Sequence, residues 1–360
     1  MLPIRTFQPM SINPFFMRRA LELAQHGRGS VSPNPMVGCV IVHDGGHPNA
    51  TATGRILGEG WHRQYGGPHA EVNAIRAVTP ADEVLLSEST AYVTLEPCSH
   101  FGKTPPCADL LITKKVRRVV CCNDDPNPQV AGQGFAKLRA AGIEVINGLL
   151  ADEGRVLNRR FFTFFEQKRP YIILKWAETA DRFMGGAGAV PVVISSPLAR
   201  RLVHRWRSEE DAILVGTTTA RNDNPHLNVR YWPGTSPVRI VLDRSLTLPH
   251  TLHLFDGSHP TRVYHNSTVA SPASQPNLSY VPADSLAEIL TDLHQQRIQS
   301  VLVEGGAHTL DTFLDADFWD EIRVFRSPDS LTNGVHAPQV RGQLIEQQHV
   351  ANDELLVYQR

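Results

Sequence analysis

The feature that most constrains the fold is an alternation of short apolar strands with amphipathic helices, which is interrupted once along the chain. In the first 150 residues the sequence predicts strands at "MVGCVIV", "AYVTLE", "RRVVCC" and "IEVI", with helices between them. A second series runs from "YIILKWA" at residue 171 to "EIRVF" at residue 321. This order is typical of a mostly parallel sheet covered by helices on both faces.

The interruption, "NGLLADEGRVLNRRFFTFFEQKRP", has a helical pattern and ends at Pro170. A chain of 360 residues is also too long for one comfortable core. We therefore expect two α/β domains, at residues 1–147 and 171–360, joined by a helical connector at 148–170.

The composition limits the classes of partner and compartment. With 35 basic and 36 acidic residues the net charge is −1, which gives no overall field to attract nucleic acid or a membrane surface. The apolar runs are much shorter than the roughly 20 residues of a membrane span, and the N-terminus lacks the pattern of a secretory signal. Five cysteines is an odd count that argues against a disulfide framework, so we predict a cytoplasmic protein. Three of these cysteines lie in predicted strands and are expected to be small buried residues: Cys39, Cys121 and Cys122.

Chemistry is indicated by "GPHAEVNAI" followed by "TLEPCSHFGKTPPC". His69, Cys98 and Cys107 supply three zinc ligands and leave a fourth position for water, as catalytic zinc sites do. Glu71, on the first turn of a predicted helix, can reach that water without binding the metal and can pass its proton to a leaving amine. A helix turn beginning at Cys98 would further favour its thiolate. A structural zinc site would instead need a fourth ligand, for which His100 is the obvious candidate.

The same arrangement, H-x-E followed by P-C-x-x-C, is the signature of zinc deaminases, although here eight residues separate the cysteines. With "SPNPMVGCVIV" and "NDDPNPQVAGQGFAKLRAAGIEV", these motifs resemble the N-terminal half of the bifunctional riboflavin biosynthesis RibD family. The resemblance implies a cytidine-deaminase-like α/β/α sandwich followed by a dihydrofolate-reductase-like α/β domain. It also implies a small-molecule substrate, bound zinc and NADPH, and a homo-oligomer.

In this family the first reaction removes an amino group from 2,5-diamino-6-ribosylamino-4(3H)-pyrimidinone 5′-phosphate. The resemblance implies that His69, Cys98 and Cys107 hold zinc and that Glu71 shuttles the proton. Substrate contacts are implied for Asn34, in the "PNP" turn, and for His100 and Lys103, between the cysteines. For Lys103, an ordinary solvated loop lysine is the alternative.

The second reaction reduces the ribosyl group to a ribityl chain with NADPH. The resemblance covers "YIILKWA", "SEEDAILVGTTTARNDNPHLNVR" and "SVLVEGGAHTL". Glycines at a strand–helix turn let backbone N–H groups approach a phosphate. Implied NADPH contacts are Ala177, Thr219, Asp223 and Gly306, and implied substrate contacts are Lys175, Arg207, Leu227, Arg230 and Glu304. Arg244 is either a partner of the cofactor 2′-phosphate or a surface arginine.

One segment departs from the family pattern. After Lys175 the family usually has an S-L-D-G-like turn and later a Ser-x-Trp, but here Arg182 replaces the glycine, and Pro191 and Val193 replace Ser and Trp. An active reductase is one interpretation, and a deaminase with an impaired or non-catalytic C-terminal domain is the alternative. Two further hypotheses are a nucleic-acid deaminase, which would need a basic channel, and a non-catalytic zinc-stabilised interaction module.

Overall fold

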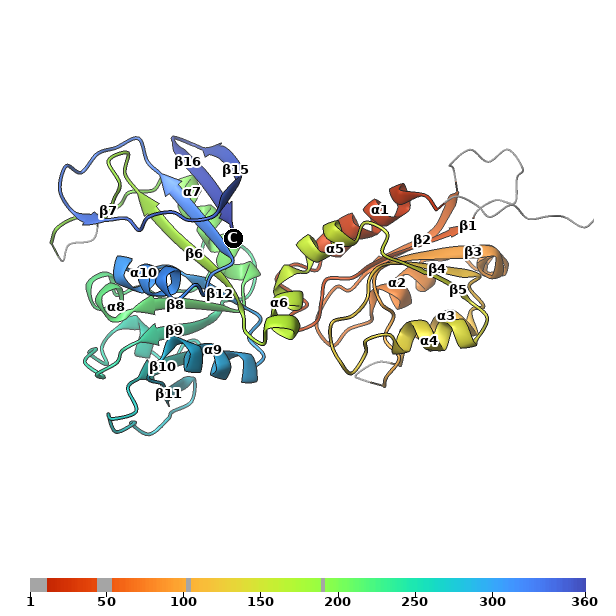
Figure 1. The fold of residues 1–360 in the computed structure, drawn as a ribbon, viewed down its shortest axis with the longest axis horizontal. Helices are drawn as coiled ribbons and strands as arrows, with labels where there is room; N and C mark the ends of the chain where they lie inside the picture. The colour runs from red at the N-terminus through yellow and green to blue at the C-terminus, as the bar shows by residue number, and fades with distance from the viewer. Residues whose placement is uncertain (1–11, 44–53, 102–104, 189–191) are drawn as a thin grey trace, which may run out of the picture. The chain divides into compact units, whose positions relative to one another are not determined.

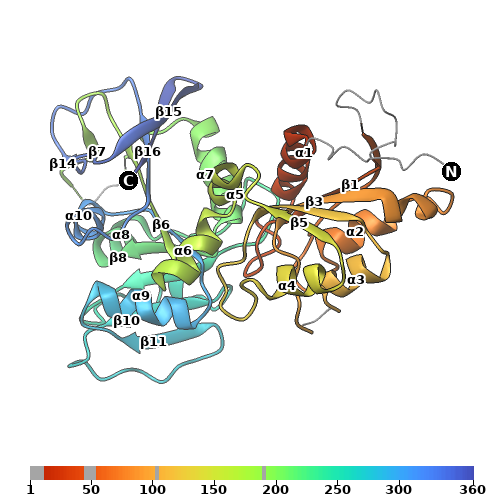
Figure 2. The same cartoon turned by 45° about the vertical axis from the view of Figure 1, so that its right-hand side comes forward.

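The computed structural model describes residues 12–43, 54–101, 105–188 and 192–360. The chain divides into two compact units, Met1–Phe162 and Thr163–Arg360 (Figures 1 and 2). The segment predicted as a helical connector contains α5 (Ala151–Leu157) and α6 (Arg159–Gln167). Among the described residues, no helix is both long and apolar enough to cross a membrane.

Unit 1 is built on a five-stranded sheet in the order β2-β1-β3-β4-β5. β1 is antiparallel to both of its neighbours, and only the β3-β4-β5 part is parallel, so the expectation of a mostly parallel sheet is wrong here. No strand is predicted at β2, because two interior glycines and the loop-like composition of the preceding residues weaken the strand signal. The strands are β1 (Gly38–His43), β2 (Arg55–Trp61), β3 (Ser89–Leu95), β4 (Arg118–Asn123) and β5 (Glu144–Asn147).

Helices cover both faces of this sheet, as the α/β/α prediction requires (Figure 1). Side chains alternate along a strand, so Val40 and Val42 face one layer while Cys39 and Ile41 face the other. The first layer contains α1 (Pro14–Gln25) and α5; the second contains α2 (Ala70–Arg76), α3 (Cys107–Thr113) and α4 (Gln133–Ala140). A 3₁₀ turn, η1 (Glu83–Glu88), precedes β3.

Helix α2 lies directly on β2, with backbone against backbone. A Cβ atom at Gly58 would lie 2.2 Å from the carbonyl oxygen of Ala74, and one at Gly60 would lie 2.3 Å from the amide nitrogen of Ala74. Real Cβ atoms essentially never approach within 3.0 Å. Glycine is therefore required at both positions by this close approach.

Unit 2 contains a nine-stranded sheet in the order β11-β10-β9-β8-β12-β6-β13-β16-β15. It is parallel from β11 to β13 and antiparallel through the last two strands. The five strands predicted in this half are all present, at β6, β8, β9, β12 and β13. The strands are β6 (Tyr171–Glu178), β8 (Ala212–Gly216), β9 (Val238–Leu242), β10 (Thr261–His265), β11 (Leu278–Pro282), β12 (Ser300–Val303), β13 (Glu321–Arg326), β15 (Gln343–Val350) and β16 (Asp353–Gln359).

The helices of unit 2 also lie on both faces of its sheet. Helix α7 (Pro197–Glu209) packs against one face through Val203 and Trp206. Helices α9 (Leu286–Gln295) and α10 (Ala307–Asp315) pack against the other face. Helix α8 (Thr217–Asp223) follows β8, the short 3₁₀ turn η2 (His253–Phe255) follows β9, and β7 (Phe183–Gly185) pairs with β14 (Val335–His336) outside the main sheet.

The strand order places the carboxyl ends of β6, β8 and β12 on the same side of the unit 2 sheet. Val303, the last residue of β12, is in register with Leu174 of β6 and Leu214 of β8. β6 continues for four residues beyond this level and β8 for two, so the three parallel strands have their carboxyl ends on the same side of the sheet. In open α/β sheets, ligands bind in a crevice at the carboxyl ends of the parallel strands.

Candidate active sites

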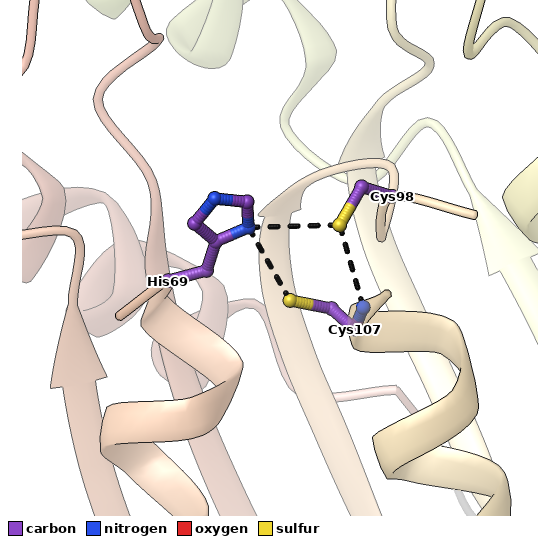
Figure 3. Close-up of side chains that lie close together, drawn as sticks. All are labelled: His69, Cys98 and Cys107. Carbon is purple, nitrogen blue, oxygen red and sulfur yellow. Dashed lines mark hydrogen bonds between the residues drawn. The ribbon is translucent and has the colours of Figure 1, made fainter. Parts of the chain in front are cut away.

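His69, Cys98 and Cys107 converge in unit 1 (Figure 3). His69 caps the N-terminus of α2, Cys107 is the first residue of α3, and Cys98 follows β3 in the intervening loop. The Nδ1 atom of His69 lies 3.6 Å from Sγ of Cys98 and 3.4 Å from Sγ of Cys107. Residues 38 positions apart in the sequence are thus brought together by the start of two helices and one loop.

These separations fit zinc. With Zn–S near 2.3 Å and Zn–N near 2.0–2.1 Å, tetrahedral angles place S and N about 3.6 Å apart. Two sulfurs and one imidazole nitrogen are also a donor set that zinc prefers. His100 is exposed and does not belong to this cluster among the described residues, so the geometry does not support a closed structural site.

The two cysteine thiols interact and shift each other's pKa in opposite directions. The side-chain hydrogen bond with Cys107 lowers the pKa of the Cys98 thiol to about 4, and the pKa of Cys107 is raised in turn by Cys98 and by burial. The backbone N–H of Cys107 donates to Sγ of Cys98 at 3.3 Å. The expectation that Cys98 itself begins a helix turn is wrong, since the helix begins at Cys107. The hydrogen bond with Cys98 also raises the pKa of His69.

Glu71 lies beside the cluster without belonging to it. It is in the first turn of α2, as predicted, and only 3% of its surface is exposed. Burial raises its pKa, and the neighbouring Cys98 sulfur adds to this effect, while a hydrogen bond with Cys107 lowers it. A buried carboxyl group with a raised pKa, next to a metal site, is suited to taking up and releasing a proton.

Asn34 is connected to the metal site through His62, which the sequence analysis did not identify. Nδ2 of Asn34 lies 3.1 Å from Nε2 of His62, and the His62 ring contacts His69 edge to face at 5.2 Å. The other nitrogen of His62 lies 3.1 Å from the backbone carbonyl oxygen of Pro68. His100 is exposed, and Lys103 lies outside the described residues.

Glu96 and Asp125 are two further buried acids that the sequence analysis missed. The Glu96 carboxylate accepts backbone N–H groups from Asp125, Gly132, Gly134 and Phe135, which fixes the start of α4 beside the Cys98 loop. Burial raises the pKa of Asp125 to about 7, with Glu96 and the Cys98 sulfur adding to it. Both residues lie inside the quoted motifs, but the role of Glu96 has no local signal because its partners lie 29 to 39 positions away in the sequence.

In unit 2, the carboxyl ends of the strands form a cavity of about 870 Å³. Its lining includes all nine residues for which the family resemblance implied cofactor or substrate contacts: Lys175, Ala177, Arg207, Thr219, Asp223, Leu227, Arg230, Glu304 and Gly306. The lining also includes His204, Tyr231 and Arg244, and Arg244 is exposed, with two long guanidinium contacts of 3.4 Å. The fold thus brings these nine residues together in one cavity of unit 2.

A charged group of three side chains lies in this cavity. Arg207 donates two hydrogen bonds to the Glu304 carboxylate, both at 2.8 Å, and Lys175 lies nearby. Burial alone would raise the pKa of Glu304, but Arg207 and Lys175 outweigh it and hold this pKa at about 2. Burial lowers the pKa of Lys175. Arg207, which alone would be interpreted as an exposed helix residue, is a buried partner of Glu304.

Two strand–helix turns meet in the same cavity. A Cβ atom at Gly216, at the end of β8, would lie 2.3 Å from Oγ1 of Thr309 in α10. A Cβ atom at Gly306, before α10, would lie 3.0 Å from Oγ1 of Thr219 in α8. Neither turn therefore has room for a side chain at its glycine. A glycine at such a turn also lets a phosphate or another backbone approach closely.

The segment that departs from the family pattern is anchored at its start. Arg182 adopts φ +69°, the left-handed region that glycine favours, and its guanidinium pairs with the fully buried Glu178 at 2.6 Å. The Asp181 carboxylate accepts the backbone N–H groups of Leu331 and Thr332. Val193 is exposed and lines the cavity, and Pro191 lies outside the described residues.

A second group of possible metal ligands, His226, His253 and Asp256, lies elsewhere in unit 2. The two imidazole rings are stacked at 3.7 Å, so their in-plane lone pairs do not converge on one point. Asp256 is moreover paired with the buried Arg239 at 3.0 Å. We assign no ion to this group.

Comparison with known proteins identifies both halves of the chain. Residues 10–123 match the family model for the cytidine and deoxycytidylate deaminase zinc-binding region, and residues 170–352 match the RibD C-terminal domain. The second match shows that a RibD C-terminal domain is present.

Whole proteins match as well. The riboflavin biosynthesis protein RibD of Aquifex aeolicus is 38% identical over 90% of this chain and 89% of its own. RibD of Escherichia coli is 37% identical over 88% of each chain.

Solved structures agree. Acinetobacter baumannii RibD gives a TM-score of 0.85 at 34% identity, covering 96% of this chain and 98% of its own. A Thermotoga maritima structure, described as a diaminohydroxyphosphoribosylaminopyrimidine deaminase/5-amino-6-(5-phosphoribosylamino)uracil reductase, gives 0.84 at 36% identity with the same coverage. The chain thus combines a zinc-binding deaminase domain with a reductase domain homologous to NADPH-dependent reductases, and it belongs to the RibD family of bifunctional riboflavin biosynthesis deaminase/reductases.

Proposed function

We propose that unit 1 deaminates 2,5-diamino-6-ribosylamino-4(3H)-pyrimidinone 5′-phosphate and that unit 2 reduces the ribosyl group of the product with NADPH. The substrates are those named for the related Thermotoga maritima protein. The observation that supports the first step most directly is Glu71, a buried acid beside three zinc-type ligands but outside their cluster. We also propose residues 1–147 and 171–360 as the two catalytic domains.

In the deaminase step, His69, Cys98 and Cys107 would hold the metal. Bound zinc would supply a water molecule acidified enough to attack the amino-bearing ring carbon at neutral pH. Glu71 takes the proton of that water and delivers it to the leaving amine, so ammonia departs and a carbonyl oxygen remains. Asn34 binds the substrate, and His62 keeps the Asn34 amide oriented toward the site.

In the reductase step, bound NADPH would supply a hydride to C1′ of the ribosyl group, and the ring oxygen would take up a proton as the ring opens to a ribityl chain. Arg207 and Arg230 bind the substrate phosphate, and Glu304 orients Arg207 through two hydrogen bonds. Leu227 and Lys175 complete the substrate side of the cavity, and Ala177, Thr219, Asp223 and Gly306 form its cofactor side.

The test supplies the pyrimidine phosphate with and without NADPH and identifies each product by mass. We expect the deaminated ribosyl compound without NADPH and the ribityl compound with it. The Glu71→Gln variant should keep its fold and zinc content and lose ammonia release by about 10²–10⁴-fold. The same variant should still reduce added deaminated substrate. Retained ammonia release in this variant would contradict the assignment of Glu71.

The same assay separates the remaining hypotheses. A zinc-stabilised interaction module predicts no product at all, and a nucleic-acid deaminase predicts inosine in tRNA and no reaction with the pyrimidine phosphate. We further propose a homo-oligomer, for which the exposed edge strand β15 offers unpaired backbone groups, with Leu344 and Ile345 42% and 48% exposed. The cytoplasmic location stays a prediction.

A further inference from the structure

His204 is a buried imidazole in the reductase cavity to which neither the motifs nor the family resemblance assigned a role. It lies on α7 and is 5% exposed. Its Nδ1 atom accepts the backbone N–H of Arg230 at 3.1 Å. The backbone of Asn228 is a second hydrogen-bond partner of the ring, and the Tyr231 ring packs against it edge to face at 4.8 Å. One side chain therefore contacts three of the four residues from 228 to 231.

The segment that His204 contacts has no regular secondary structure of its own. Asn224 and Leu227 both adopt positive φ angles, +41° and +50°, which side-chain-bearing residues adopt only when surrounding contacts impose them. The N–H of Val229 donates to Oγ of Ser236, and Nη1 of Arg207 donates to the carbonyl oxygen of Asn228. The conformation of this segment thus depends on a few side chains outside it.

His204 and Arg207 are three residues apart and therefore lie on the same face of α7. Arg207 binds the carbonyl group of Asn228, and His204 binds the N–H group of Arg230. Two neighbouring side chains of one rigid helix thus hold the backbone on either side of Val229. The backbone of Arg230 is fixed relative to Arg207 by this pair of contacts.

The charge state of His204 suits this role. Because Nδ1 accepts a hydrogen bond, the neutral ring has its proton on Nε2. Burial, together with the positive charges of Arg207 and Arg230, lowers the pKa of His204 to about 4. The imidazole is therefore neutral at physiological pH and keeps its acceptor.

We propose that His204 is a positioning residue of the reductase: by accepting the backbone N–H of Arg230, it fixes the Arg230 backbone relative to Arg207, so that both arginines can bind the substrate phosphate. This inference rests on the proposed function, which assigns the phosphate to the two arginines. His204 acts through Arg230 and takes no part in hydride transfer.

The test uses the full-length protein and two substrates, the phosphorylated 5-amino-6-ribosylaminouracil and the same compound without its phosphate. His204→Leu removes the acceptor and should raise KM for the phosphorylated substrate about fivefold, the effect of losing one hydrogen bond that positions a binding group. Both kcat and the kinetics with the unphosphorylated compound should change less than about twofold, since only phosphate binding is altered.

His204→Asn supplies a rescue, because the Asn side-chain oxygen is bonded to Cγ in the same place as Nδ1. It should restore KM to within about twofold of the unmodified protein. His250→Leu, at an exposed histidine outside the cavity lining, is the matched control. Zinc content and ammonia release monitor folding of unit 1 in every variant, and the unfolding temperature monitors unit 2.

Three outcomes would overturn the proposal. An equal rise in KM for both substrates in His204→Leu would indicate general disruption of the cavity. An unchanged KM would show that the hydrogen bond does not matter for phosphate binding. Failure of His204→Asn to rescue would exclude the Nδ1 acceptor as the cause. If Arg230→Gln leaves the preference for the phosphorylated substrate intact, the phosphate assignment itself is wrong; if it abolishes that preference while His204→Leu does not, only the positioning role is wrong.

Discussion

Replacement of Glu304 by glutamine should destabilise unit 2 by about 3 kcal/mol at pH 7. The side chain is 10% exposed and accepts both hydrogen bonds of Arg207 at 2.8 Å. Its pKa in the folded protein is about 2, compared with an ordinary value of 4.5. This difference corresponds to about 3 kcal/mol of stabilisation of the folded state by the ionised carboxylate. Removing one partner of a buried pair typically costs 3–5 kcal/mol, which agrees.

The direction of the pKa shift of Glu304 determines how the stability of unit 2 depends on pH. Because the folded pKa lies below the unfolded value, the stabilisation is complete well above pH 4.5 and is lost as the pH falls toward 2. At pH 4 about 1 kcal/mol should already be lost. The Glu304→Gln variant has no such carboxylate. The difference in free energy of unfolding between this variant and the unmodified protein should therefore become smaller as the solution is acidified.

Urea unfolding followed by tryptophan fluorescence measures this difference. The signal comes mainly from unit 2, which contains four of the five tryptophans: Trp176, Trp206, Trp232 and Trp319. Glu346→Gln, at an exposed position of β15, serves as the matched control. The reasoning would be refuted by a difference under 1 kcal/mol at pH 7, or by one that stays constant from pH 7 to pH 4.

Three other predictions concern single contacts. Arg182→Gly should be more stable than Arg182→Ala by about 1 kcal/mol in thermal unfolding, because φ is +69° there; equal stabilities would contradict this. Glu96→Gln should cost about 2 kcal/mol and speed zinc loss to a chelator, since the carboxylate holds backbone N–H groups beside the Cys98 loop; an unchanged rate of zinc release would argue against it. Gly216→Ala should weaken NADPH binding about tenfold in titrations, and Thr309→Ala should restore it by removing the atom 2.3 Å from the new methyl group; a failure of this rescue would exclude the clash as the cause.

The sequence was sufficient for the fold class because the central strands of both units are continuously apolar. "YIILKWA" and "AILVG" have no competing interpretation as loops, and they form β6 and β8. Edge strands were missed for the opposite reason. Seven of the eight residues of β15 are exposed, so the strand has almost no hydrophobic pattern, and β2 contains interior glycines that favour a loop.

The metal ligands could be predicted because their chemistry is rare and their order along the chain is characteristic. The residues that support the two sites could not be predicted. Glu96, His62 and His204 bind backbone groups or side chains from distant parts of the chain, and a polar residue of this kind leaves no periodic or local signal. The buried state of Arg207 likewise depends on Glu304, which lies 97 residues away.

The close backbone contact between α2 and β2 limits the substitutions that the deaminase domain can tolerate. Main-chain atoms of α2 rest on Gly58 and Gly60 and so help to position His69 and Glu71, together with the packing of Ala74 and Ile75 in the core. The interface between α2 and β2 has no room for a side chain at either glycine. A single methyl group at residue 58 would have to push the helix away by about 1 Å, a displacement that can cost an enzyme about a hundredfold in rate.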